Sequence, residues 1–357
     1  MKKALALLLA LIMVFALVAC GAEATPETET TVDQDAVDMD GERTYDKPEI
    51  TIVLSDINNA DSILGKASQQ IADLVNEKSN GRIYIDTYHG GQLGTEEENI
   101  ENLRVGTVGI TRINVANLQS RGIDVPEYTL FGLPYLLRSK DHAVSFFYSD
   151  RGEELASRIG EVTNGEIYAM PGYIISTPRH FFSKTPVTCM ADMKGMKVRS
   201  ETTEMKIDMM AAFGMSATPM GLNDMYSALQ TGMIDGGEHN LTSIKSYAFY
   251  EQCPYILLTH NNYNANIYLI SGTVYDMLND EDRTLINECV REACEKATED
   301  YPNEDLMIRE ELEAKNVTFT EPTDIETWQE AAQVLYEKYG AGYEAFIAEV
   351  LSYDAEN

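Results

Sequence analysis

Short apolar runs that suit β-strands alternate along the chain with longer segments whose apolar residues recur at helical spacing. Thr95 and Glu98 have the spacing of a capping box, which marks the start of a helix. Strands joined through helices predict a parallel α/β sheet with helices packed on it. In the first third of the chain, the pattern predicts strands over residues 50–54, 83–88 and 108–113 and helices over residues 63–78 and 96–105.

The same alternation returns in the second half of the chain. The segment 280–315 is highly charged, has apolar positions at helical spacing and predicts one long helix. Because open α/β sheets bind ligands at the carboxyl ends of their strands, a second set of strands predicts two lobes with a ligand cleft between them. The pattern predicts strands over residues 167–170, 196–199 and 266–271 and further helices over residues 202–213, 224–230 (capped by Asn223), 324–339 and 343–352.

The first twenty residues have the pattern of an export signal. Two lysines precede an unbroken apolar run over residues 4–18, which is shorter than the ~20 residues of a membrane-spanning helix. The run ends in Leu17-Val18-Ala19-Cys20, which resembles the bacterial lipobox, whose cysteine receives a diacylglycerol and becomes the new N-terminus. Residues 21–48 have few apolar side chains and predict a disordered tether. We therefore expect residues 1–20 to be a lipoprotein signal peptide and the membrane contact to be a lipid anchor on Cys20.

The overall charge is strongly acidic. Acidic residues outnumber basic ones by 58 to 27, which gives the 357-residue chain a formal charge of −31. Nucleic acids and anionic lipid surfaces require clustered Lys and Arg, so this surplus argues against both as partners. Hydrophobic residues make up 44% of the chain, which is enough for a folded core.

The residue types that carry catalysis or bind metals lack the spacings that such sites require. The five histidines are scattered, and no Gly-x-Ser-x-Gly motif marks a hydrolase nucleophile. We therefore expect a binding protein with no enzyme activity, metal or cofactor. Whether the downstream cysteines form a disulfide stays open, because they match no zinc or haem pattern: Cys189, Cys253, Cys289 and Cys294.

From about residue 49 onward, a series of motifs resembles the DctP family of TRAP-type solute-binding proteins. The motifs are Gly81-Arg82-Ile83, Gly91-Gln92-Leu93-Gly94, Leu133-Pro134-Tyr135-Leu136, Asp192-Met193-Lys194-Gly195-Met196-Lys197-Val198-Arg199 and the segment 224–236. The resemblance implies a two-lobed periplasmic-binding-protein-like α/β fold with the ligand cleft between the lobes and a long bracing C-terminal helix. It assigns residues 49–176 and 265–304 to lobe one, and residues 177–264 and 305–357 to lobe two and the C-terminal helices.

The resemblance also implies a function. An extracytoplasmic protein of this family captures a small-molecule organic acid and delivers it to a small and a large integral membrane subunit, with transport driven by an ion gradient. We expect the protein to act as a monomer. Two other functions remain open: a lipoprotein that senses the ligand and presents it to a receptor, and a binding lipoprotein of an ABC transporter with the same general fold.

Arg199 is the first ligand-binding candidate. The resemblance implies that the arginine of the Lys-Gly-x-Lys-x-Arg segment clamps the ligand carboxylate, and a guanidinium offers two parallel N–H donors that match it. Arg179 is implied as a second contact or as support for Arg199.

Where the family commonly has a ligand-contacting Asn, this chain has His239, so His239 or Asn240 is expected in the pocket, beside an apolar wall at Leu222. Because two arginines disfavour imidazolium and a carboxylate favours it, binding is expected to take up a proton near neutral pH.

The resemblance also implies that lobe one contributes polar side chains near its strand ends. Arg112 and Asn114 lie at the end of the strand over residues 108–113, and Asn58 lies in the loop after the first strand. Tyr173 lies at the crossing between the lobes, where its ring would either stack on a sugar or pack in the core.

The expected arginine contacts imply an organic acid as the ligand. The asparagine-rich run Asn261-Asn262-Tyr263-Asn264-Ala265-Asn266 offers polar contacts to hydroxyl groups. It favours a sugar acid, such as a uronate or an aldonate, over a C4-dicarboxylate.

Replacing the lipidation candidate tests the anchor. Cys20→Ser removes the thiol that a lipobox modifies, so the variant should accumulate as an unprocessed precursor without lipid. Metabolic labelling with a radioactive fatty acid measures this directly. Equal label on the variant and the wild-type protein would exclude Cys20 as the modified residue.

Overall fold

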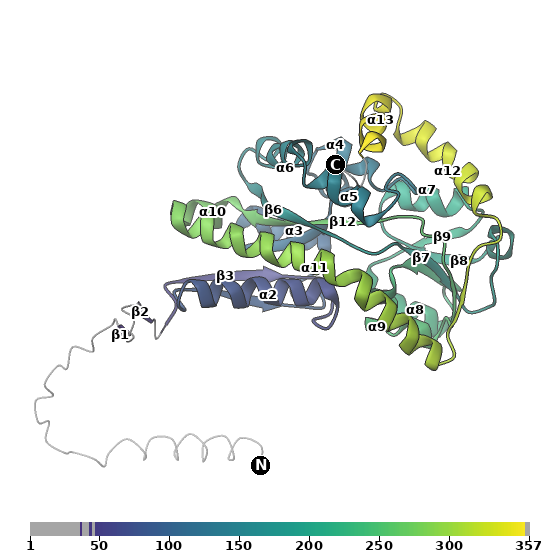
Figure 1. The fold of residues 1–357 in the computed structure, drawn as a ribbon, viewed down its shortest axis with the longest axis horizontal. Helices are drawn as coiled ribbons and strands as arrows, with labels where there is room; N and C mark the ends of the chain where they lie inside the picture. Colours follow the sequence, from purple (N-terminus) through teal and green to yellow (C-terminus); the bar gives the residue numbers. More distant parts are fainter. Residues whose placement is uncertain (1–35, 38–42, 45–46, 354–357) are drawn as a thin grey trace, which may run out of the picture.

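The computed structural model describes residues 36–37, 43–44 and 47–353 (Figure 1). The expected signal peptide with Cys20 and most of the expected tether lie outside the described residues. Before the body, the strands β1 (Ala36–Val37) and β2 (Arg43–Thr44) pair with each other. Within the described part of the chain, no helix has the length and apolar character needed to cross a membrane, and no group of His, Cys, Asp or Glu side chains is arranged to hold a metal ion.

The first lobe is built on a five-stranded sheet with the order β4-β3-β5-β12-β6. β3 is parallel to β4 and β5, but β12 is antiparallel to both β5 and β6. The prediction of a purely parallel sheet is therefore wrong at β12, because this strand enters from the other lobe and not through a helical crossover. The strands are β3 (Ile50–Ser55), β4 (Ile83–Tyr88), β5 (Ile110–Asn114), β6 (Ile167–Ile175) and β12 (Ala265–Ser271).

The second lobe is built on a six-stranded sheet with the order β13-β11-β7-β10-β8-β9. Its parallel pairs are β8–β9, β8–β10 and β11–β13, and β7 is antiparallel to both of its neighbours. This sheet is also mixed, and its strands are short. They are β7 (His180–Ser183), β8 (Lys197–Ser200), β9 (Ser216–Pro219), β10 (Gly236–His239), β11 (Tyr255–Leu257) and β13 (Thr318–Thr320).

Helices cover both sheets, and most begin at a polar N-cap. Ser62 caps α2, and Thr95 and Glu98 form the predicted capping box of α3. One predicted cap is wrong: Asn223 lies inside a 3-10 turn, and α8 begins after Asp224. The helices are α2 (Ile63–Lys78), α3 (Glu96–Val105), α4 (Pro126–Leu130), α5 (Lys140–Phe147), α6 (Asp150–Val162), α7 (Glu204–Ala212), α8 (Met225–Thr231), α9 (Leu241–Ser246) and α10 (Gly272–Met277).

Three features join the two lobes. The chain crosses between the sheets at residues 176–179 and again at residues 258–264. Helix α11 (Asp280–Ala314) packs on α2 and β6 of the first lobe and on α9 of the second (Figure 1), and contains Pro302. At the C-terminus, α12 (Ile325–Tyr339) packs on α7, whereas α13 (Glu344–Ser352) packs near α5 through Phe346. Residues 305–353, which were expected in lobe two, therefore contact both lobes.

Aromatic side chains hold the C-terminal helices in place. Trp328 is fully buried, with its ring centroid 5.3 Å from Phe181 and 4.9 Å from Phe213 of the second lobe. Phe346 lies 5.9 Å from Phe146 of the first lobe. Each buried aromatic side chain contributes a large apolar area, so these contacts brace the two lobes from one side.

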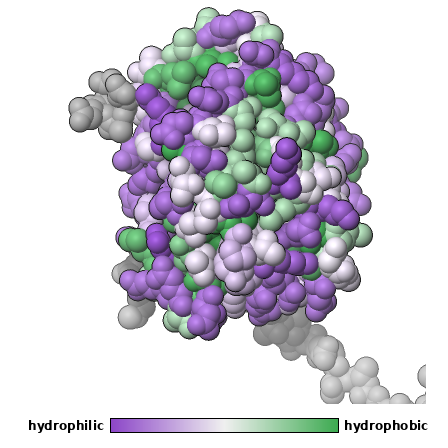
Figure 2. Space-filling view, turned by 90° about the vertical axis from the view of Figure 1, so that its right-hand side faces the viewer, coloured by the Kyte–Doolittle hydropathy of each residue, from purple (hydrophilic) through white to green (hydrophobic). Residues whose placement is uncertain are grey.

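The outer surface is mainly polar. At the end of the molecule that carries the second lobe, hydrophilic side chains cover most of the face and hydrophobic ones are scattered among them (Figure 2). The four cysteines within the described residues have free thiols, and Cys253, Cys289 and Cys294 are buried. These buried thiols act as small apolar side chains of the core.

Gly236 offers a test of the pairing between β10 and β7. A Cβ at this position would lie 2.1 Å from the carbonyl oxygen of Phe182, so Gly236→Ala must push the two strands apart. We expect the free energy of unfolding to fall by about 1–3 kcal/mol, the usual cost of overpacking. Urea denaturation measures the loss. Gly221→Ala is the control, because its Cβ would meet only the Asp224 carboxylate at 3.4 Å. Equal stability of the two variants would contradict this packing.

Candidate functional site

A cavity of about 340 Å³ lies between the two lobes and collects side chains from both. Its lining comes from strand ends, the loops beside them and the first turns of helices, in the place expected for the ligand cleft of an α/β protein. Eight of the nine ligand-binding candidates line this cavity, and Tyr173 does not. The eight are Asn58, Arg112, Asn114, Arg179, Arg199, Leu222, His239 and Asn240.

Arg199 stands out as a buried cation without a carboxylate partner. It lies on β8 and is only 6% exposed. Its Nε donates to the carbonyl oxygen of Met220 at 3.1 Å, and no ion pair involves its guanidinium among the described residues. Burial lowers the pKa of Arg199 from its usual value, yet a guanidinium stays charged at all physiological pH values. A buried charge without a partner is costly, so this position favours an anion from outside the chain.

Arg179, in contrast, is engaged by the protein. Its Nη2 lies 2.5 Å from Glu238 Oε2 and 3.1 Å from Glu201 Oε1. Lys206 Nζ lies 3.7 Å from Glu238 Oε1, and Asn261 Nδ2 donates to the same oxygen at 2.8 Å. Burial alone would raise the pKa of Glu201, but Arg179 and Lys206 outweigh it and lower that pKa to about 2. Both carboxylates are therefore ionised at neutral pH.

His239 is held as a neutral imidazole. Its Nδ1 lies 3.0 Å from the backbone nitrogen of Asn240 and 3.1 Å from Asn240 Oδ1, so it contacts a donor and an acceptor of the same residue. Burial, followed by Arg179 and Arg199, lowers the pKa of His239 to about 3. His239 therefore stays neutral to a lower pH than the sequence predicted, because burial and the two arginines together disfavour imidazolium more strongly than the arginines alone.

Asn240 and Leu222 line the same cavity with different local roles. Asn240 Oδ1 accepts from the backbone N–H of Ser243 at 3.1 Å and so caps helix α9. This contact uses the side-chain oxygen and orients the amide. Leu222 begins a 3-10 turn after Gly221 and adds an apolar side chain to the wall.

The first lobe presents a network fixed by a buried ion pair. Arg112 donates from Nη2 to Asp56 Oδ1 at 2.8 Å and from Nη1 to Asn266 Oδ1 at 2.7 Å. Burial would raise the pKa of Asp56, but Arg112 lowers it to about 2. Asp56 also accepts from the backbone and side chain of Asn58 at 2.8 and 3.1 Å. Asp56 thus holds both Arg112 and Asn58, while Asn114 Oδ1 accepts from the backbone N–H of Ala116.

Sequence reasoning missed five charged side chains of this cavity: Glu96, Glu97, Arg121, Glu201 and Asp224. Glu96 Oε2 accepts from Asn117 Nδ2 at 3.0 Å and lies 3.5 Å from Arg121 Nε. Burial raises the pKa of Glu96. A signal existed for Glu201, since it follows the expected clamp Arg199 by two residues, just beyond the end of β8.

Direct contacts across the cavity hold the lobes together. Asn223 Nδ2 donates to the carbonyl oxygen of Gly90 at 3.2 Å, and Arg121 Nη2 donates to Thr202 Oγ1 at 3.0 Å. Asn59 Nδ2 donates to the carbonyl oxygen of Ser246 at 3.2 Å. The structure is therefore a closed form, held by individual polar contacts that each contribute about 1 kcal/mol.

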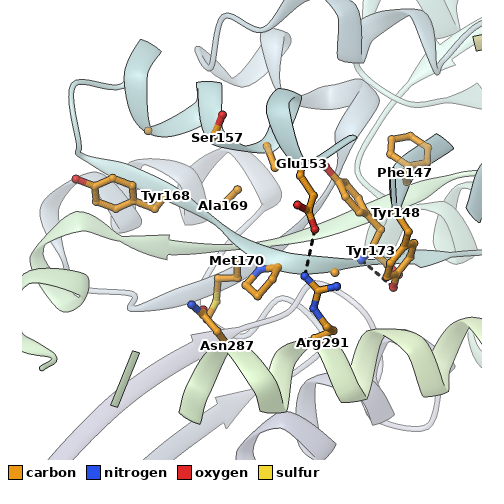
Figure 3. Close-up of a pocket in the computed structure, with 14 residues that line it drawn as sticks. Phe147, Tyr148, Glu153, Ser157, Tyr168, Ala169, Met170, Tyr173, Asn287 and Arg291 are labelled. Carbon is orange, nitrogen blue, oxygen red and sulfur yellow. Dashed lines mark hydrogen bonds and ion pairs between the residues drawn. The ribbon is translucent and has the colours of Figure 1, made fainter. Parts of the chain in front are cut away.

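Tyr173 packs in the core and lines a different hollow, between β6, α6 and α11 (Figure 3). Its hydroxyl lies 2.8 Å from that of Tyr128 and donates to the carbonyl oxygen of Gly152 at 3.0 Å. The rim of this hollow carries the ion pair between Glu153 and Arg291. Of the two roles expected for Tyr173, the structure supports packing.

Comparison with known proteins identifies relatives over most of the chain. Residues 54–342 match the DctP family model, described as bacterial extracellular solute-binding protein, family 7. The sialic acid-binding periplasmic protein SiaP of Vibrio cholerae is 28% identical over 278 residues, which cover 78% of this chain and 84% of the relative.

The comparison with solved structures identifies proteins of the same kind. A TRAP periplasmic solute-binding protein from Pseudomonas putida F1 with bound D-glucuronate has a TM-score of 0.79 and 29% identity, and the match covers 86% of this chain and 98% of that one. A second such protein, from Xanthobacter autotrophicus Py2 with bound β-D-galacturonate, has a TM-score of 0.78 and 26% identity. The match covers 85% of this chain and 100% of that one.

The low pKa of His239 predicts a loss of stability in acid. Below pH 6.5 the unfolded chain binds a proton that the native imidazole does not bind until about pH 3, so stability falls as the pH decreases through this window. This group alone removes about 2 kcal/mol between pH 7 and pH 5. His239→Asn abolishes that contribution, so the stability difference between variant and wild type should shift in favour of the variant at pH 5. Urea denaturation at both pH values tests this, and a difference that is the same at pH 7 and pH 5 would refute it.

Proposed function

Because the chain belongs to the DctP family of bacterial extracellular solute-binding proteins, we propose that it captures a sugar acid, with Arg199 as the carboxylate clamp. Members of this family are the extracytoplasmic substrate-binding components of TRAP transporters and are not enzymes. The single observation that carries the proposal is the buried guanidinium of Arg199, which faces the cavity without an ion pair among the described residues.

The charges around the cavity support a ligand with one carboxylate. Among the buried or largely buried groups around the cavity there are five cations, Arg112, Arg121, Arg179, Arg199 and Lys206, and four anions, Asp56, Glu96, Glu201 and Glu238. The exposed carboxylates of Glu97 and Asp224 also line the cavity, but they remain in contact with water. A monocarboxylate balances the one cation in excess, whereas a C4-dicarboxylate leaves a buried negative charge. The relatives with bound D-glucuronate and β-D-galacturonate agree with a uronate as the probe ligand.

The remaining contacts suit hydroxyl groups of a sugar. His239 offers a polar imidazole ring, Asn58, Asn114 and Asn240 belong to the lining, and Glu96 supplies carboxylate oxygens. Closure of the lobes removes water from the cavity and strengthens each of these contacts. We propose that the closed monomer, anchored through lipid on Cys20, delivers the acid to the small and large membrane subunits.

Substitution of Arg199 tests the clamp. Arg199→Ala should weaken D-glucuronate binding by about 2–5 kcal/mol, because it leaves the ligand carboxylate buried without its partner. Arg199→Lys should also bind weakly, since an ammonium cannot make the forked contact. Isothermal titration calorimetry measures both.

Arg309→Ala is the matched control. Arg309 is an exposed arginine on α11 that pairs with Glu313, so its removal should leave the affinity unchanged. If Arg199→Ala binds the uronate as tightly as the wild-type protein does, the clamp lies elsewhere. If the wild-type protein binds L-gulonate or another aldonate and no uronate, the ligand is an open-chain sugar acid.

A further inference from the structure

Beside Arg199 lies a buried cluster of four charges: Arg179 and Glu201 line the ligand cavity, and Lys206 and Glu238 lie behind them. Lys206 lies on α7, is 3% exposed and does not line the ligand cavity. Its Nζ has no hydrogen-bond partner among the described residues, and its one ion-pair contact there is Glu238 at 3.7 Å. A fully buried lysine with such a loose contact is costly to the fold, so its charge requires an explanation.

The cluster holds two carboxylates beside the clamp. Glu201 is the carboxylate whose charge acts most strongly on Arg199, yet the two groups form no ion pair in the described structure. Glu201 instead places Oε1 3.1 Å from Arg179, which is also paired with Glu238 at 2.5 Å. The Arg179 guanidinium therefore pairs with two carboxylates, and Lys206 supplies the second positive charge that balances them.

We propose that Lys206 is a positioning residue that keeps Arg199 free for the ligand. By balancing Glu238, it lets Arg179 hold Glu201 away from the clamp. Without Lys206, two carboxylates share one guanidinium, and Glu201, which lies just beyond the end of β8, turns to Arg199 two residues earlier. Glu201 then occupies the donors that the ligand carboxylate requires, so the protein inhibits itself. This inference rests on the proposed role of Arg199 as the clamp.

The charged groups around Lys206 determine how its replacement alters the charge balance of the cluster. Glu201 and Glu238 favour its charge, and Arg179 opposes it, while burial lowers its pKa. Glu204, on the first turn of α7, pairs outward with Lys338 and does not enter the cluster. Lys206→Met keeps the length and apolar stem of the side chain and removes the charge alone.

Binding measurements on a set of variants test the inference. Lys206→Met should weaken D-glucuronate binding at least tenfold, and Lys206→Arg should retain most of the affinity because it restores the charge. The double variant Lys206→Met with Glu201→Gln should recover affinity, since the competing carboxylate is gone. A purely structural role for Lys206 predicts no recovery, so an equally weak double variant would overturn the proposal. Glucuronamide, the neutral analogue, serves as a second probe, and its affinity should change little between wild type and Lys206→Met.

A crystal structure of the ligand-free Lys206→Met variant tests the role of Lys206 without depending on which ligand the protein binds. Glu201 within ~4 Å of the Arg199 guanidinium would support it. Glu201 still paired with Arg179 alone would overturn it, even if the protein binds sugar acids as proposed. Conversely, failure of the wild-type protein to bind sugar acids would refute the proposed ligand and leave this structural result to stand.

Discussion

An unbalanced positive charge in a closed cavity is the constraint on which the rest of this structure depends. Arg199 is buried, charged and without a carboxylate partner among the described residues, a state that a protein interior disfavours. The neighbouring arginines do not share this state, because Arg112 pairs with Asp56 and Arg179 pairs with Glu238. The fold therefore reserves one guanidinium for an external anion and neutralises the others from within.

The two-lobed architecture provides this cavity by bringing strand ends from separate sheets together. Two crossing segments and the long helix α11 connect the lobes on one side, while the contacts across the cavity are few and polar. Such a construction permits opening about the connected side, because single polar contacts are weak and exchange readily with water. Ligand binding adds the missing negative charge and so favours the closed form.

Long periodic elements were predictable from the sequence, and short or non-local ones were not. The bounds of α2 match the predicted helix, and those of α11 differ by one residue, because their apolar spacing and caps are local signals. The four residues of β10 read Gly-Gly-Glu-His, with no strand pattern, and its pairing with β7 comes from tertiary contacts. In the site, family motifs predicted eight lining residues, whereas Glu96 and Lys206 needed the folded geometry because nothing in their local sequence distinguishes them from surface charges.

The measurement that tests this account most directly is a crystal structure of the protein with D-glucuronate or L-gulonate bound. The account predicts that the ligand carboxylate lies between the lobes with both oxygens at hydrogen-bond distance, ~2.7–2.9 Å, from the Arg199 guanidinium. It also predicts that Arg179 stays paired with Glu238 in the bound form. A ligand carboxylate bound to another group, with Arg199 in contact only with protein or water, would contradict the central claim.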